Sequence, residues 1–146
     1  MLSTEIADKL KNLKYFLGVF ARDTLPAPSQ KFPLSLVANT DTHDQPGTHW
    51  VCIYIDENGE GEYFDSYGLR PLQAEFINYL YENCENGFSW NKITLQCTTC
   101  VTCGEYCCAY LLLRTIGYSY HDFIKLFTNN KITNDIIIKN IFSALT

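Results

Sequence analysis

The chain has 146 residues, of which 47% are hydrophobic and 18% are charged, and its formal net charge is −5. This composition is typical of a folded globular protein and excludes an intrinsically disordered one. The acidic balance also argues against a protein whose main task is to grip a phosphate backbone, because that task needs clustered Lys and Arg. A chain of about 150 residues can bury one real core, so we expect a single domain over residues 1–146.

The expected location follows from hydropathy and cysteine usage. No apolar run approaches the roughly 20 residues that span a bilayer, and the N-terminal stretch MLSTEIADKLKNLKYFLG is charged where a signal peptide would be apolar. Seven cysteines are an odd number, so they cannot all form structural disulfides. We expect a monomeric protein with free thiols, inside a cell or a virion and not at a membrane.

The N-terminal third predicts one helix, one loop and one strand. Ser3 can cap a first helix whose apolar positions continue to about Leu13. The segment LPAPSQKFP holds three prolines in nine residues, which predicts a surface loop. A short strand follows at LSLVA.

The clearest pattern in the sequence is a hairpin. A β-branched and aromatic run over Trp50–Ile55 is followed by the turn signal Asn58-Gly59 and by a return strand that ends near Asp65. Hairpin strands run antiparallel, so we expect His49 at one outer end to lie beside Asp65 at the other.

The middle of the chain predicts a helix and a strand. Pro71 suits the first position of a helix, and the apolar residues that follow it are Leu72, Phe76, Ile77 and Leu80. Residues 92–96 predict a short strand.

The C-terminal part predicts three helices. The first is buried, begins at Cys103 and continues to about Arg114. Shorter helices are expected over residues 120–127 and 134–145, the second with an apolar stripe of Ile137, Ile141 and Leu145.

The stretch QCTTCVTCGEYCC, residues 96–108, raises the question of what its cysteines do. Four of them, at positions 97, 100, 103 and 107, follow the spacing C-x2-C-x2-C-x3-C, which is that of bacterial iron–sulfur ligation. The run lacks the proline that follows in such proteins and has no second motif. A zinc site that uses Cys97 and Cys100 is a smaller variant of the same alternative. We expect no metal.

A different interpretation sorts these cysteines by local structure. A thiol at a helix N-terminus has its thiolate favoured by the helix dipole and by free backbone N–H groups, and Cys103 is placed there. Cys107 and Cys108 fall in mid-helix, where free cysteine is usually a small buried hydrophobe. Cys97 and Cys100 lie on the approach loop, near enough to Cys103 for a regulatory disulfide.

Three further residues supply what a cysteine nucleophile needs. His49 is a general base that Asp65 can hold in the correct tautomer. Gln96, seven residues before Cys103, can join the backbone N–H of Cys103 as a donor to an oxyanion. Trp50, next to His49, is expected to stack over the imidazole or to belong to the core.

The chain resembles the adenovirus endopeptidase (adenain) family of cysteine proteases, with its relatives in virophages and Maverick/Polinton transposons. The matching stretches are YFLGVF, VANT, GTHW, YFDSYG, and Gln96 followed seven residues later by CGEYCCAYLL. They run from about Tyr15 to Leu112. GTHW combined with Q-x6-CG-x2-CC is specific, whereas each part alone is weak.

The resemblance implies an α+β fold, of the adenain-like and ubiquitin-like-protease type: a mixed sheet flanked by helices, with the nucleophile at the N-terminus of a central helix. It implies that His49, Asp65 and Cys103 are base, orienting acid and nucleophile. Gln96 would supply the oxyanion hole, and Gly104 of the CG motif would support it. Asp65 stands where adenain has Glu, and the broader clan uses Asp.

The same resemblance implies cleavage of viral capsid precursor proteins during virion maturation, within the virion and the infected-cell cytoplasm or nucleus. Adenain is activated by DNA and by a viral peptide that bonds a cysteine just before the ITL stretch. That position is Lys92 here, and the net charge argues against DNA. The sequence itself therefore requires no cofactor, although Cys84 or Cys97 offers a thiol to a peptide in another geometry.

Two alternative functions are also compatible with the sequence. Within the enzymes, the runner-up is an isopeptidase that processes ubiquitin-like modifiers, which share the clan. Outside them, the fold could serve as a silent interaction module in a capsid, but such a module has no need of the His, Asp, Gln and Cys set.

Overall fold

The computed structural model describes residues 1–146 and contains one mixed five-stranded sheet with strand order β1-β2-β3-β4-β5. The inner strands pair antiparallel, whereas β1 runs parallel to β2 and β5 parallel to β4. The strands are β1 (Phe16–Ala21), β2 (Leu34–Asn39), β3 (Trp50–Ile55), β4 (Gly61–Phe64) and β5 (Phe88–Trp90).

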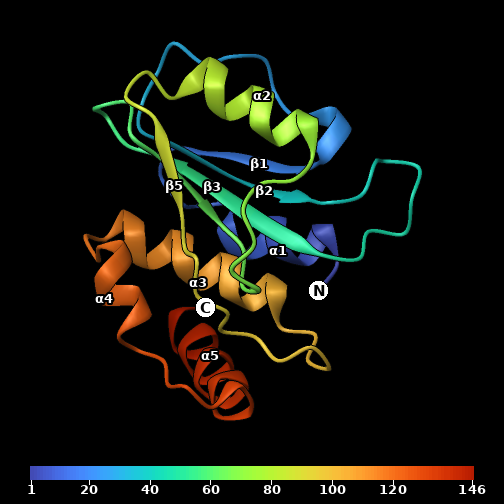
Figure 1. Cartoon of the computed structure of the whole chain (residues 1–146), viewed down its shortest axis with the longest axis vertical. Coiled ribbons are helices and arrows are strands. Elements are labelled where there is room, and N and C mark those ends of the chain that lie inside the picture. The colour runs from blue at the N-terminus through green and yellow to red at the C-terminus, as the bar shows by residue number, and fades with distance from the viewer.

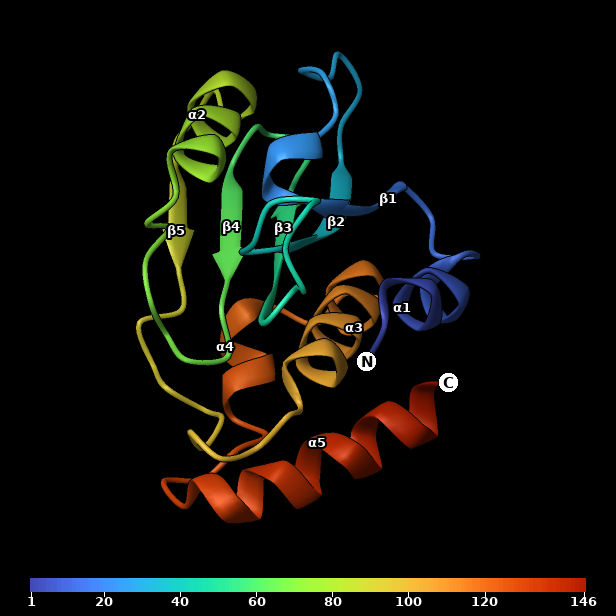
Figure 2. The same ribbon diagram turned by 90° about the vertical axis from the view of Figure 1, so that its right-hand side faces the viewer.

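Helices cover both faces of this sheet, as Figures 1 and 2 show. On one face lies α2 (Ala74–Asn83). On the other face lie α1 (Ser3–Leu10) and α3 (Cys103–Thr115), with α5 (Lys131–Leu145) packed on the far side of α3. The short elements are the 3-10 helix η1 (Arg22–Thr24) and α4 (Tyr120–Ile124). The expected α+β fold is confirmed. None of the helices combines the length and the apolar character that crossing a membrane requires.

The two faces of the sheet build two separate cores, because successive side chains of a strand point to opposite faces. Leu36 and Ile53 are partners in the β2–β3 register and belong to the core beneath α2. The next pair along, Val37 and Cys52, belongs to the core against α3. The sheet is therefore buried on both sides, which holds β3 and β4 in fixed positions.

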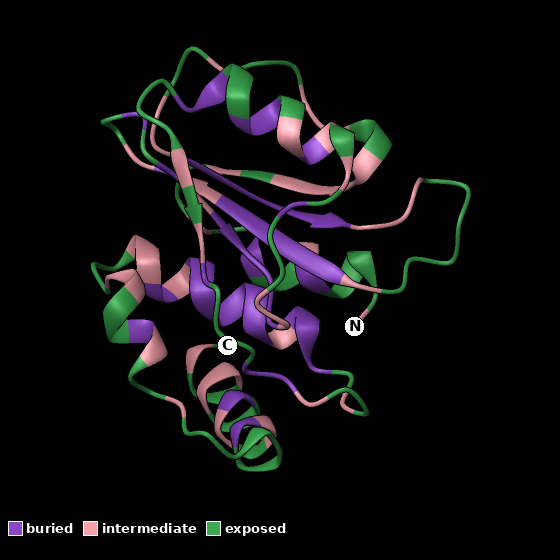
Figure 3. Ribbon diagram, in the orientation of Figure 1, coloured by how far each residue is buried: buried purple, intermediate pink, exposed green.

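The helix α3 is the centre of the larger core. Tyr106, Cys107 and Leu111 have no exposed surface, and Figure 3 draws most of α3 as buried. A helix enclosed by a sheet and by other helices must be apolar on nearly all sides, and the sequence CGEYCCAYLLL meets this requirement. The expected central helix with Cys103 as its first residue is confirmed.

The strand expected over residues 92–96 is wrong. The strand in this part of the chain is β5, which ends at Trp90. The chain then turns at Lys92, whose φ of 48° lies in the left-handed region. The backbone N–H groups of Leu95 and Gln96 both donate to the carbonyl of Ser66, at 2.9 and 3.1 Å, in place of a strand ladder.

The start of the helix expected from Pro71 is also wrong. The helix α2 begins only at Ala74, after Gln73 as N-cap, and Leu72 is 59% exposed. The strand β1 was not expected at all. Gly18, with φ of 139°, lies at an irregularity in the β1–β2 register. It interrupts the alternation of apolar and polar residues by which a strand is recognised in a sequence.

Other helix boundaries differ by a few residues. The first helix ends at Leu10, before Leu13, and α4 ends at Ile124, short of residue 127. The last helix begins earlier than expected, at Lys131, and Ile138 takes the fully buried place that the stripe assigned to Ile137. Helix ends fray, so offsets of this size are ordinary.

A partly buried ion pair joins α3 to the sheet. Glu62 on β4 accepts hydrogen bonds from Arg114 Nε at 2.8 Å and Nη2 at 2.7 Å, and from the hydroxyl of Tyr110. The guanidinium also lies over the ring of Tyr54, 4.6 Å from its centroid. These contacts fix the C-terminal half of α3 on β4.

Glu62→Ala is therefore expected to lower the free energy of unfolding by about 3 kcal/mol, because it leaves the Arg114 guanidinium without its partner. Urea unfolding measures the change. Lys11→Ala, which removes the exposed pair with Asp8, is the control and should leave the midpoint unchanged. Equal midpoints for the two variants would contradict this account of the Glu62 contacts.

Candidate active site

A cavity of about 140 Å³ opens at the N-terminal end of α3, where the start of β3 and the loop after β4 lie over the helix (Figure 1). Its lining includes His49, Gln96 and Cys103, and Asp65 contacts His49 from the protein side. A second hollow of about 350 Å³ adjoins it and shares Trp50 in its lining. The structure thus brings the four candidate residues together at one end of a longer cleft.

The thiol of Cys103 is held in a place that favours its thiolate. Cys103 is the first residue of α3, at the positive end of the helix dipole. Burial by itself raises the pKa of the thiol, but hydrogen bonds with the His49 side chain and the Trp50 backbone outweigh burial and lower that pKa below its ordinary value. The residue is only 9% exposed, on the cavity.

The imidazole of His49 is held between a carboxylate and this thiol. His49 Nε2 lies 2.8 Å from Asp65 Oδ1, which leaves Nδ1 as the nitrogen available to Cys103. Burial lowers the pKa of His49, yet the hydrogen bonds and charges of Asp65 and Cys103 together raise it to about 9. The geometry therefore favours an imidazolium beside a thiolate at neutral pH.

The aromatic side chain that stacks on His49 is Tyr67. Its ring centroid lies 4.7 Å from that of the imidazole, with 24° between the planes. Trp50 instead belongs to the core, where its Nε1 donates to the carbonyl of Met1 at 3.0 Å. Of the two alternatives expected for Trp50, the structure shows the place in the core and not the stacking over the imidazole, because a strand residue next to His49 points to a different side. Trp50 still supports Cys103, but through its backbone.

Three hydrogen bonds, in addition to the one with His49, hold Asp65 in place. Its backbone N–H donates to Asn91 Oδ1 at 3.0 Å, and its carbonyl accepts from Asn91 Nδ2 at 2.6 Å. Its Oδ1 also accepts from the backbone N–H of Tyr67, at 2.8 Å. Asn91 is 1% exposed. No local sequence pattern points to this role of Asn91, because an asparagine after a short strand is usually a turn residue.

The amide of Gln96 is buried and has a partner at each end. Oε1 accepts from the hydroxyl of Ser66 at 2.6 Å, and Nε2 donates to the carbonyl of Cys100 at 2.7 Å. Gln96 is 2% exposed and lines the cavity with Cys103. A primary amide nitrogen carries two hydrogens, so one N–H of Gln96 remains for a ligand.

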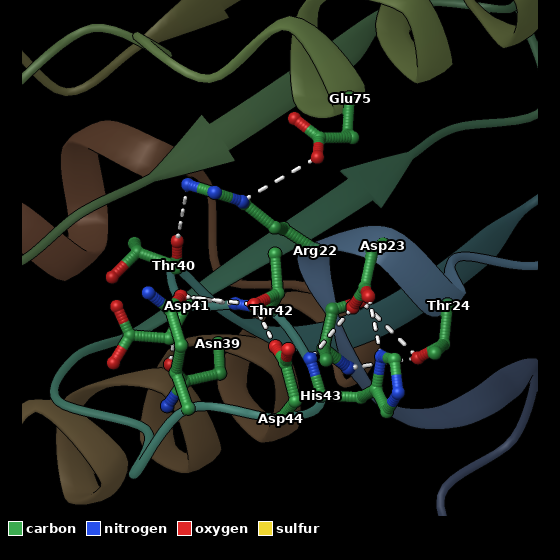
Figure 4. Close-up of polar contacts among 12 residues, drawn as sticks. Arg22, Asp23, Thr24, Asn39, Thr40, Asp41, Thr42, His43, Asp44 and Glu75 are labelled. Carbon is green, nitrogen blue, oxygen red and sulfur yellow. Dashed lines mark hydrogen bonds and ion pairs between the residues drawn. The ribbon is translucent and has the colours of Figure 1, made fainter.

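The loop that leads into His49 is anchored by polar contacts, which Figure 4 shows. Asn39 Oδ1 accepts from the backbone N–H of Asp41 at 2.9 Å, and Asp41 Oδ2 accepts from those of Gly47 and Thr48, both at 3.1 Å. Gly47 has φ of 82°, and a Cβ there would lie 3.1 Å from Asn39 Nδ2. These contacts close the loop and set the position of the next residue, His49.

The same figure shows a second anchor for this loop, on η1. Asp23 accepts from the backbone N–H of His43 at 2.8 Å and pairs with its Nδ1 at 2.5 Å. Arg22 Nη1 donates to the carbonyl of Thr40 at 3.2 Å. Residues of η1, which directly follows β1, therefore hold the loop that precedes β3.

Gly104 lies beneath the first residue of the chain. A Cβ at Gly104 would lie 3.0 Å from both the Cβ and the Sδ of Met1, so a larger residue would force Met1 to move. Met1 lines both hollows of the cleft. Gly104 thus allows Met1 to pack closely on this end of α3.

The remaining cysteines do not share one site. Cys97 and Cys100 form a disulfide with each other and not with Cys103, whereas Cys107 and Cys108 are fully buried in the core. The four sulfurs of the iron–sulfur spacing therefore do not converge. No group of three or more His, Cys, Asp or Glu side chains is arranged so that it could hold a metal ion.

Comparison with known proteins gives a partial relative. No protein-family model matches the chain. Over 100 residues it is 26% identical to a protein of Acanthamoeba polyphaga mimivirus named "Putative thiol protease R355". The match covers 62% of this chain and 33% of that protein, so the chain spans about a third of the relative's length.

Two solved structures share the fold. The ASFV pS273R protease superposes with a TM-score of 0.66 and 19% identity, over 97% of this chain and 65% of that one. The central domain of the Lpg1148 protein from Legionella pneumophila, described as uncharacterized, superposes with a TM-score of 0.56 and 15% identity, over 100% and 98% of the two chains. The arrangement of sheet and helices is thus one that the ASFV pS273R protease shares.

The thiols should differ in their reaction with iodoacetamide. We expect Cys103 to be alkylated well before Cys107 and Cys108, because its pKa is lowered whereas burial raises theirs, that of Cys108 to about 12. The alkylation rate of Cys103 should rise at a lower pH than for an ordinary thiol. In His49→Ala this rise should move to higher pH, since the partner that favours the thiolate is gone.

Mass spectrometry of the labelled peptides measures these rates, and Glu85→Ala, at an exposed position, is a control that should keep the profile of the unmodified chain. Equal labelling of the three cysteines, or a profile that His49→Ala leaves in place, would contradict the assignment of an activated thiol.

Proposed function

We propose that this chain is a cysteine endopeptidase of the adenain-like clan that cleaves viral capsid precursor proteins during virion maturation. The observation that carries the proposal is the site itself: a thiol at a helix N-terminus, against an imidazole whose other nitrogen is held by a buried carboxylate. The name of the mimivirus relative, "Putative thiol protease R355", and the fold shared with the ASFV protease support the same class.

The proposed chemistry begins with attack of the Cys103 thiolate on the carbonyl carbon of the scissile peptide bond. A carbon–sulfur bond forms, and the carbonyl oxygen takes the negative charge. The free N–H of Gln96 and the backbone N–H of Cys103 are the donors for this oxyanion. Because these donors stand in place before the substrate arrives, they require no reorganisation during the reaction.

His49 then moves the proton. As imidazolium it donates a proton to the leaving amine, the carbon–nitrogen bond breaks, and a thioester on Cys103 remains. Neutral His49 next takes a proton from water, which attacks the thioester and releases a carboxylic acid and the thiolate. Asp65 holds the ring in one orientation throughout and stabilises the charged form. Tyr67 stacks on the imidazole and limits its rotation.

The cleft suits an extended polypeptide as substrate. The cavity at Cys103 shares Met1, Gly47 and Trp50 in its lining with the larger hollow, which lies along the end of β1 and the loop that precedes His49. We infer that this hollow receives residues on one side of the scissile bond. All the groups used in the mechanism come from one chain, so we propose that the monomer is the active form.

Cys103→Ala should abolish cleavage of a capsid precursor that is expressed together with the chain, because no other group can form the thioester. Electrophoresis of the precursor over time measures the loss. Cys108→Ala, five residues further along α3, removes a buried thiol of unrelated role and should retain cleavage. If Cys103→Ala cleaves the capsid precursor as fast as the unmodified chain, the proposed function is refuted.

A panel of ubiquitin-like conjugates in the same assay tests the runner-up activity. If the chain cleaves such a conjugate and leaves the capsid precursor intact, its function is the processing of ubiquitin-like modifiers and not virion maturation. The thiol mechanism would be the same in both cases. Parallel reactions with duplex DNA and with candidate peptides show whether either one raises the rate.

A further inference from the structure

Ser66 makes a buried contact that the proposed mechanism does not yet use. Its hydroxyl lies 2.6 Å from Gln96 Oε1. Ser66 is 1% exposed and Gln96 is 2% exposed, so water does not compete for this hydrogen bond. Buried polar groups almost always have a hydrogen-bond partner, which restricts their orientation.

The direction of this hydrogen bond follows from the other end of the amide. The carbonyl of Cys100, 2.7 Å away, can only accept, so the amide atom that faces it must be Nε2. The atom that faces Ser66 is then Oε1, which also only accepts. The hydroxyl of Ser66 must therefore donate, and no alternative orientation of the amide satisfies both neighbours.

This orientation decides what Gln96 offers to the cavity. With Nε2 on the Cys100 side, one N–H satisfies that carbonyl and the second is free to donate to an oxyanion. In the reversed amide, Oε1 would face the Cys100 carbonyl and would repel any oxyanion. The Cys100 carbonyl disfavours the second arrangement, and the Ser66 hydroxyl, by donating to Oε1, holds the side chain in the first.

Ser66 also holds Gln96 through the backbone. Its carbonyl accepts from the backbone N–H groups of Leu95 and Gln96, at 2.9 and 3.1 Å. Because Ser66 directly follows Asp65, this one segment carries the acid that holds His49 and the residue that holds Gln96. The position of the oxyanion donor is thereby tied to that of the triad.

We propose that Ser66 is a positioning residue for the oxyanion hole, acting through Gln96 without contact to the substrate. The proposal rests on the endopeptidase function proposed above. Ser66→Ala should lower kcat roughly tenfold with little change in KM, since one buried hydrogen bond is lost. Gln96→Ala should lower kcat more, by about 10²–10³.

Two probes separate positioning from general damage to the site. A peptide aldehyde whose carbonyl carbon bonds the Cys103 sulfur places its oxygen in the oxyanion hole, so Ser66→Ala should weaken its binding by a factor similar to the loss of kcat. Iodoacetamide alkylation of Cys103 forms no oxyanion, and its rate should not change. Ser66→Ala should have no further effect on kcat in a Gln96→Ala background.

The structure offers a matched control in Ser35, a serine that is also 1% exposed but whose hydroxyl has no partner. Ser35→Ala should leave kcat and aldehyde binding unchanged. If Ser66→Ala behaves like Ser35→Ala, or if it slows alkylation as much as turnover, the positioning role is overturned.

A readout that does not depend on turnover keeps this proposal distinct from the endopeptidase function. The side-chain amide protons of Gln96, observed by NMR, should shift and broaden in Ser66→Ala and stay as they are in Ser35→Ala. Unchanged Gln96 signals in Ser66→Ala would overturn the role of Ser66 even in an active protease. If the Gln96 signals shift in Ser66→Ala but the unmodified chain cleaves no protein, the role of Ser66 in orienting Gln96 stands. The endopeptidase function is then the proposal that is refuted.

Discussion

The hydrogen bond between His49 and Asp65 is the contact on which the rest of the site depends. It joins the residue before β3 to the residue after β4, and the β3–β4 register, which pairs Cys52 with Phe64, brings these two ends together. Since Asp65 holds Nε2, only Nδ1 can serve Cys103. A buried imidazole without this partner would lose its charge, and the thiolate would lose its counter-ion.

The two cores explain why this contact is precise enough for chemistry. Helix α2 and helix α3 cover opposite faces of the sheet, so neither β3 nor β4 can shift without disturbing packing on both sides. Asn91 fixes the backbone of Asp65 from β5, and Ser66 carries the constraint on to Gln96. Acid, base, nucleophile and oxyanion donor thus share one rigid frame.

The sequence predicted those parts of this frame that depend on local patterns. The hairpin turn placed His49 near Asp65, and the change to helical periodicity placed Cys103 at the start of a buried helix. The expected strand over residues 92–96 failed, since long-range hydrogen bonds to Ser66 determine that segment. For the same reason no local pattern revealed Asn91 or Ser66, whose partners lie 26 and 30 residues away.

The most direct test of the central claim is an NMR titration of the His49 imidazole. The account predicts that His49 stays charged through neutral pH and titrates with a pKa of about 9. In Cys103→Ala this pKa should fall, because the thiolate that helps to hold the charge is removed. A pKa at the ordinary value for histidine, equal in both proteins, would contradict the proposed pairing of imidazolium and thiolate.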